Sequence, residues 1–265
     1  MQLLVVHPGA HAGAHLLLRR VDRDLASLHL QSSRSDDVSA DGLWLDAESR
    51  RGRYTFNYGV FRLDRGLAWG ALPINNDSEG GYLRARYEHG RWNWSAGLDR
   101  IGSPSGNSFD GYYGTGFLRY QLRARVGIGA SASLRRSDDG TDYSTRWFMD
   151  RRGDWGLTRL QLDQAHAGTR DDWRLSLDQD LPMRQGSRLA LSAQLGQVRE
   201  DGVGSTRTMA LAALGGVDLG DRVTLDGNVR WTHGSGPQAF RGADLNVNLA
   251  WRVAARWWLQ ASAYR

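Results

Sequence analysis

The chain carries a repeated pattern in which apolar and polar residues alternate over segments of about ten residues. From Val223 to Trp231 every second residue is apolar or glycine and the intervening residues are polar, and the segment from Ala243 to Trp251 repeats this pattern closely. Because successive side chains of a strand point to opposite sides, each segment has one apolar face and one polar face. Segments of this length are typical of tilted strands that cross a lipid bilayer.

The same pattern, followed along the whole chain, predicts about 16 strands, a number typical of porin-sized barrels. The predicted strands span residues 13–22, 25–33, 42–50, 53–63, 80–88, 91–101, 111–122, 125–135, 143–150, 155–165, 172–181, 187–197, 207–217, 222–232, 242–252 and 255–265. Residues 1–8 offer one further strand. No shift of composition divides the chain, so we predict an all-β fold, an antiparallel transmembrane β-barrel that forms a single domain over residues 1–265.

The predicted connections alternate between short turns and longer loops. Short turns are expected at 89–90, 123–124, 152–154, 220–221 and 254–255, and longer loops at 102–110, 136–142, 166–171, 198–206 and 233–241. In outer-membrane barrels the short turns face the periplasm and the longer loops face outside. The connection 64–81 is the longest, and two interpretations stay open: an ordinary outer loop, or a segment folded into the lumen as a constriction.

Composition agrees with this fold and excludes several chemistries. Gly is abundant at 33 residues, Pro is scarce at 5, Trp is frequent at 11, and the mean hydropathy is −0.53. No apolar run is long enough for a membrane-spanning helix. There is no cysteine, which excludes disulfides and thiolate metal sites. The net charge of +5 comes entirely from arginine, and because the arginines are spread among acidic residues we expect no nucleic-acid binding.

The two ends of the chain raise a further expectation. Residues 1–14 lack the basic start of a secretory signal peptide, so we expect a mature or truncated portion of a longer precursor. Pairing the predicted strands through short turns places both ends of the strand set at the outer rim. We therefore expect the barrel to be incomplete at one or both ends, with a missing C-terminal strand.

Polar residues on one side of the predicted strands are expected to line a lumen, because a charge facing lipid at mid-depth costs about 2–4 kcal/mol. The predicted lumen residues are Arg84, Arg86, Asp99, Arg119, Arg146, Asp150, Arg174, Asp178, Arg188, Asp226, Arg230, Asp244 and Arg252. The opposite side carries tryptophans near strand ends, as an interfacial aromatic girdle requires. The predicted girdle residues are Trp92, Trp173, Trp231, Trp251 and Trp257. The predicted lumen carries charges of both signs. Two alternatives are equally compatible with this: a hydrated conduit with a slight preference for anions, and a plugged lumen in which the charges only pair.

The same residues allow other interpretations. A soluble β-sandwich would bury these tryptophans in its core, but would more often carry larger apolar blocks. No recognised hydrolase or metalloprotease motif is present, so we expect no enzyme, no catalytic residue, no metal and no cofactor. Two alternatives remain: an outer-membrane hydrolase whose Ser and His come from different strands, and a non-conducting structural barrel.

The overall pattern resembles Gram-negative outer-membrane β-barrels, porin-like or usher-like, over essentially the whole chain. A fainter likeness lies in Gly59–Asp64, Leu67–Gly70, Asn76–Asp77 and Gly80–Tyr82, which look like barrel segments of ushers that export fibre subunits. The resemblance implies an outer-membrane location and a passive or gated conduit for solutes or for an exported polymer or protein. It also implies outer-membrane lipid and lipopolysaccharide as partners, whereas the oligomeric state is left open.

Overall fold

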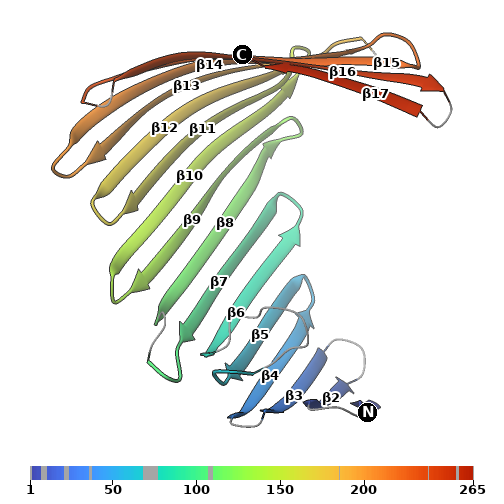
Figure 1. Ribbon diagram of the computed structural model, residues 1–265, viewed down its shortest axis with the longest axis vertical. Coiled ribbons are helices and arrows are strands. Elements are labelled where there is room, and N and C mark those ends of the chain that lie inside the picture. Colours follow the sequence, from blue (N-terminus) through green and yellow to red (C-terminus); the bar gives the residue numbers. More distant parts are fainter. Residues whose placement is uncertain are drawn as a thin grey trace. The chain divides into compact units, whose positions relative to one another are not determined.

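The protein is built from antiparallel strands, as a computed structural model shows for residues 2–6, 11–20, 24–35, 38–67, 77–106, 110–184, 186–237, 239–254 and 257–264. The strands of these residues, drawn in Figure 1, are β1 (Gln2–Val6), β2 (His11–Arg20), β3 (Asp24–Ser35), β4 (Val38–Arg51), β5 (Tyr54–Leu63), β6 (Ser78–His89), β7 (Trp92–Gly102), β8 (Gly111–Arg123), β9 (Val126–Ser137), β10 (Gly140–Gly153), β11 (Gly156–Ala167), β12 (Arg170–Leu181), β13 (Ser187–Glu200), β14 (Gly204–Asp218), β15 (Val223–Ser235), β16 (Phe240–Ala254) and β17 (Trp257–Tyr264). No helix of the described residues is long and apolar enough to cross a membrane.

Each strand pairs with its neighbour in the chain. Antiparallel ladders join successive strands from β1 to β7 and from β11 to β17. Strand β9 also pairs with β10. In such a meander each strand forms its backbone hydrogen bonds with the strands before and after it in the chain, to which tight turns connect it.

Contacts between residues divide the chain into two compact units. One comprises residues 1–118 and 131–143, and the other comprises residues 119–130 and 144–265. Strands β2 to β7 belong to the first unit and β11 to β17 to the second, whereas β8, β9 and β10 contribute residues to both.

The predicted all-β antiparallel class is confirmed, and every predicted strand has a counterpart. Residues 2–6 form the additional strand offered by the N-terminal segment. The predicted long loops at 136–142, 166–171 and 198–206 are wrong. Strands continue into these segments and are closed by tight turns at 138–139, 168–169 and 201–203. Gly140, Gly168 and Gly202 have φ of 137°, 57° and 78°, which only glycine adopts without strain, so the backbone can reverse tightly there.

Few apolar side chains are buried. The buried hydrophobic residues of the described part are Ala40, Leu63 and Leu67. Large apolar side chains on many strands are exposed instead, including Leu83 and Leu98 at 54% each and Leu195 at 49%. A β-sandwich packs the inner faces of two sheets over a dry core. Within each unit, the described residues form no such layer, and the large apolar side chains stay exposed.

Candidate functional site on the polar face

In the first unit the strand register separates polar from apolar side chains. Residues opposite each other in a ladder share a face, so each set of paired residues forms a row across the strands. Two polar rows are Asp46–Gly59–Tyr82–Asp99 and Glu48–Asn57–Arg84–Gly97. The row between them points to the other side and contains Ala47, Tyr58, Leu83 and Leu98. We call the side that carries Asp46 and Arg84 the polar face, and the side that carries Leu83 the apolar face.

The second unit repeats this separation. One row of paired residues is Asp178–Ser192–Ala212–Arg230–Asp244, and the adjacent row is Leu177–Ala193–Leu211–Trp231–Ala243. The first row is predominantly polar and the second is apolar. The same names are used for the two faces of this unit.

The predicted lumen residues all lie on the polar face of their own unit. Register places Arg84, Arg86, Asp99, Arg174, Asp178, Arg188, Asp226, Arg230, Asp244 and Arg252 there. Hydrogen bonds place the remaining three: Arg119 binds Asp150, and Arg146 binds Asp163. Asp163 is opposite Arg174 in the β11–β12 ladder, which ties these residues to the same face. That this face lines a lumen remains a prediction.

Many charged groups of the polar face are paired. Arg84 Nη2 lies 3.2 Å from Asp99 Oδ1, and Arg146 Nε lies 2.6 Å from Asp163 Oδ1. Sequence reasoning missed Asp163, although its alternation with Leu160 and Leu162 indicates the polar side of its strand. Arg230 and Asp244 are opposite each other in register without an ion pair among the described contacts. The Arg side chains of these pairs are largely exposed, 61% for Arg84 and 55% for Arg146, so water reaches them.

Three polar contacts reach across a whole strand because a glycine lies between the partners. Each joins residues two strands apart: Tyr82 to Asp46 over Gly59, Arg119 to Asp150 over Gly127, and Arg188 to Asp226 over Gly216. At Gly127 a Cβ would lie 2.8 Å from Arg119 Nη2 and 3.0 Å from Asp150 Oδ1, so a side chain there would displace the pair. We call these three contacts the glycine-spanned pairs.

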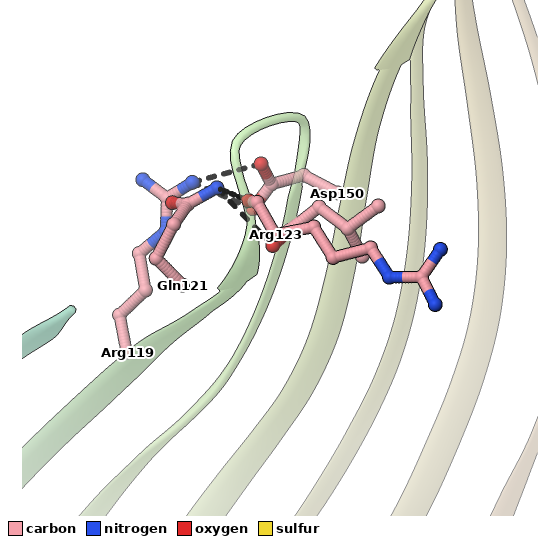
Figure 2. Close-up of polar contacts among 5 residues, drawn as sticks. Arg119, Gln121, Arg123 and Asp150 are labelled. Atoms are coloured by element: carbon pink, nitrogen blue, oxygen red, sulfur yellow. Dashed lines mark hydrogen bonds and ion pairs between the residues drawn. The ribbon is translucent and has the colours of Figure 1, made fainter.

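Figure 2 shows the glycine-spanned pair in the β8–β10 region. Arg119 Nη2 donates to both carboxylate oxygens of Asp150, at 3.0 and 2.8 Å. Beside it, the amide of Gln121 donates to the carbonyl oxygens of Arg123 and Val126 and so braces the turn between β8 and β9. The Arg119 side chain is 40% exposed, so its guanidinium is more shielded from water than those of Arg84 and Arg146, and the Asp150 side chain is 20% exposed.

Aromatic residues of the apolar face gather next to a short turn. Tyr54, Tyr87 and Trp94 are aligned in register on β5, β6 and β7. The ring centroids of Tyr54 and Tyr87 are 4.8 Å apart, and each lies 6.2 Å from that of Trp94. We call this group the aromatic cluster. Aromatic side chains in such a position are typical of the interface between lipid and water.

The predicted girdle tryptophans Trp92, Trp173, Trp231, Trp251 and Trp257 all lie on the apolar face. Trp92 and Trp257 are the first residues of their strands. Trp92, Trp173, Trp251 and Trp257 are exposed. Their role as a membrane girdle is a prediction that these positions do not test.

The connection after β5 begins by folding over the polar face. Leu67 is 1% exposed and lies against Gly42, whose missing Cβ would be 2.7 Å from Leu67 Cδ2. Leu63, opposite Gly42 in the β4–β5 ladder, completes the contact. The start of this connection therefore lies against the polar face, while the choice between an ordinary outer loop and a constriction inside a lumen stays a prediction. The part of the prediction that concerns residues 68–76 lies outside the described residues.

The same connection ends in a polar anchor. Asp77, which is buried, accepts hydrogen bonds from the hydroxyls of Ser103 and Ser105 at 2.6 and 2.5 Å and from the Ser105 amide at 3.1 Å. These hydrogen bonds from Ser103 and Ser105 lower the pKa of the Asp77 carboxyl below its usual 3.8, since they favour the charged form. Asp77 thus ties the β5–β6 connection to the β7–β8 connection.

The histidines of the described residues that have polar or ring contacts lie apart from any metal-binding group. Among the described residues, no group of His, Cys, Asp or Glu is arranged to hold a metal ion. His166 Nδ1 lies 2.6 Å from Asp171 Oδ1, and the ring of His233 stacks on Trp231 with centroids 6.0 Å apart. The polar face is an extended surface of charged and polar side chains, many of them paired.

Comparison with known proteins shows a distant structural likeness and no match by family or sequence. No protein-family model matches the chain. No curated protein matches it by sequence. Among solved structures it is similar to one described as a bacterial polysaccharide outer membrane secretin, at 13% identity and a TM-score of 0.40, covering 90% of this chain and 88% of that chain.

Proposed function

We propose that the chain forms a transmembrane β-barrel in the outer membrane of a Gram-negative bacterium, with its polar face lining an aqueous conduit. The observation that carries this proposal is the separation of the two faces. Rows of exposed Leu, Val, Tyr and Trp alternate in register with rows of Arg, Asp, Asn and Ser.

Lipid on one side and water on the other explains both faces. Apolar surface exposed to water is unfavourable by about 25 cal/mol per Å², and within each unit the large apolar side chains of the described residues are exposed. An arginine that faced hydrocarbon at mid-depth would also be unfavourable, by about 2–4 kcal/mol. On the polar face the arginines are open to water and many are paired with carboxylates. Outer-membrane lipid and lipopolysaccharide are therefore the partners of the apolar face.

The cargo is a hydrophilic solute, or an exported polymer or protein. A porin-like conduit and an usher-like export channel share the lining described here, and both need water-exposed charges such as Arg84 and Arg188. We further propose that the protein is not an enzyme. We also propose that it does not bind nucleic acid, because its arginines alternate with acidic partners instead of forming a continuous basic surface.

A non-conducting structural barrel is the second candidate, and one observation favours it. Leu67 packs onto the polar face against Gly42, and a side chain that covers this face would narrow the passage. Replacing Leu67 by Asp distinguishes the two roles, because it removes this anchor without touching the strands.

Planar-bilayer recording of the refolded chain tests the conduit directly. We expect stable conductance steps with a modest preference for anions, given the excess of arginine. A chain that shows the heat-modifiable migration of a folded barrel but passes no ions, as wild type and as Leu67→Asp, would contradict the conduit and favour the structural role.

A further inference from the structure

A hollow on the polar face of the first unit has the features of a binding site. It has a volume of about 420 Å³. Its lining side chains on this face come from β4 to β8: Glu48, Arg50, Thr55, Asn57, Arg84, Arg86, Ser95 and Thr115, with Gly97 between them. We propose that this hollow, here named the arginine hollow, binds a carboxylated sugar unit of the conducted cargo.

The strand register builds the arginine hollow from two adjacent rows. One row is Glu48–Asn57–Arg84–Gly97 and the other is Arg50–Thr55–Arg86–Ser95. Gly97 leaves the floor open, since a Cβ there would lie 2.8 Å from Thr115 Oγ1 and 3.5 Å from Arg84 Cγ. The hollow exists because Gly97 and Ser95, which have no side chain or a short one, are paired with the long side chains of Arg84 and Arg86.

Charge in the arginine hollow favours an anion. It contains three guanidinium groups against one carboxylate. Arg50 is held by Glu48 through a 2.7 Å contact, and Arg84 by Asp99 at 3.2 Å. Arg86 is exposed and takes part in no ion pair within the described part of the chain. Arg86 therefore offers a guanidinium whose donors are available to a ligand.

The remaining lining side chains narrow the chemistry of the ligand. Guanidinium binds a carboxylate through two parallel hydrogen bonds, a geometry that a single neutral hydroxyl does not match. Thr55, Asn57, Ser95 and Thr115 provide hydroxyl and amide groups suited to the hydroxyls of a sugar. The volume lies in the range of small-molecule sites. A carboxylate that carries several hydroxyls satisfies both sets of groups.

This inference rests on the proposed function only for the origin of its ligand, so it is tested by equilibrium binding instead of conduction. The refolded full chain in detergent is titrated calorimetrically with glucuronate, with glucose as the neutral probe and acetate as the carboxylate without hydroxyls. We expect glucuronate to bind measurably and more tightly than either of the other two. Equal binding of glucose or of acetate would overturn the proposal.

Variants localise the binding. Arg86→Gln should weaken glucuronate binding about fivefold or more, the effect of losing an exposed charge-assisted hydrogen bond. The matched control is Arg100→Gln on β7, which removes the same charge from the apolar face and should change binding by less than about twofold. Equal effects of the two variants would overturn the assignment. Arg50→Gln, also in the arginine hollow, provides a second variant if Arg86→Gln folds poorly.

The two proposals fail separately. A chain that conducts ions but does not bind glucuronate contradicts the arginine hollow alone. A chain that binds glucuronate through Arg86 but carries no current supports the arginine hollow and contradicts the conduit.

Discussion

Arg188 on β13 binds Asp226 on β15 across the whole width of β14, with Nη2 2.7 Å from Oδ1. The contact is possible because Gly216, which is paired with both residues in the ladders, places no side chain between them. In the two other glycine-spanned pairs a glycine likewise lies between the partners, so in these three contacts the missing side chain lets polar groups two strands apart meet.

Replacing Gly216 by Ala should separate Arg188 from Asp226, because the added methyl group would overlap both side chains. The Arg is 66% exposed, so we expect the free energy of unfolding to fall by no more than about 1 kcal/mol. We also expect the ion selectivity of the conduit to change, because both charges of the pair become free to act on passing ions while the net charge stays the same. The measurement is reversal potential in asymmetric salt. Gly116→Ala is the control, because nothing lies within 4 Å of its Cβ position; equal shifts for both variants would contradict the role of the glycine.

Removing the carboxylate of Asp150 should cost more than removing that of Asp226. Arg119 is only 40% exposed and its Nε is buried without a hydrogen-bond partner, so the unpaired guanidinium cannot be fully hydrated. We expect Asp150→Ala to lower the free energy of unfolding by about 1–3 kcal/mol. A double-mutant cycle with Arg119→Ala measures the coupling in urea. Additive effects of the two substitutions would mean that the pair contributes nothing.

Placing an arginine on the apolar face tests which medium covers that face. Leu191 on β13 is 42% exposed on the apolar side, and we expect Leu191→Arg to reduce the free energy of folding into lipid by about 2–4 kcal/mol if it lies at mid-depth. Gln194→Arg, on the same strand but on the polar face, should be tolerated. Folding into vesicles, followed by heat-modifiable migration on gels, gives the comparison. If both variants fold equally well, lipid does not cover the apolar face.

The aromatic cluster should stabilise the sheet beyond the area that its rings cover. Tyr87→Ala breaks the contacts with Tyr54 and Trp94, and such contacts contribute about 0.5–1.5 kcal/mol in addition to burial. Tyr58→Ala removes a ring of the same type from the same face and serves as the control. Denaturant unfolding in vesicles should show the greater loss for Tyr87→Ala. A loss of stability no greater than that of the control would show that the ring contacts of the aromatic cluster do not stabilise the sheet.

The anchor at Asp77 should depend on pH. Because its folded pKa lies below the unfolded value of 3.8, the carboxylate contributes stability above that pH and loses the contribution as the pH falls through the folded pKa. We therefore expect Asp77→Asn to lower the urea midpoint at neutral pH and to match the wild type in strong acid. A difference that persists unchanged in strong acid would show that the charge of Asp77 is not the cause.

Much of this architecture can be read from local sequence. Alternation with a period of two residues predicts strands and faces, and it placed Arg84, Asp226 and Trp231 on the sides where register has them. The alternation fails at connections such as 136–142, where glycine at a positive φ allows a tight turn and the strand continues past a polar stretch.

The fold class, the alternation of the two faces and the charged and aromatic residues on each face can be predicted from the sequence. Which of those residues meet is known only from the folded chain: Tyr82 reaches Asp46, Leu67 turns back onto Gly42, and Arg50, Arg84 and Arg86 share one hollow. The face of a strand residue follows from the geometry of its own backbone, whereas cross-strand partners depend on register and on the size of residues that are distant in the chain.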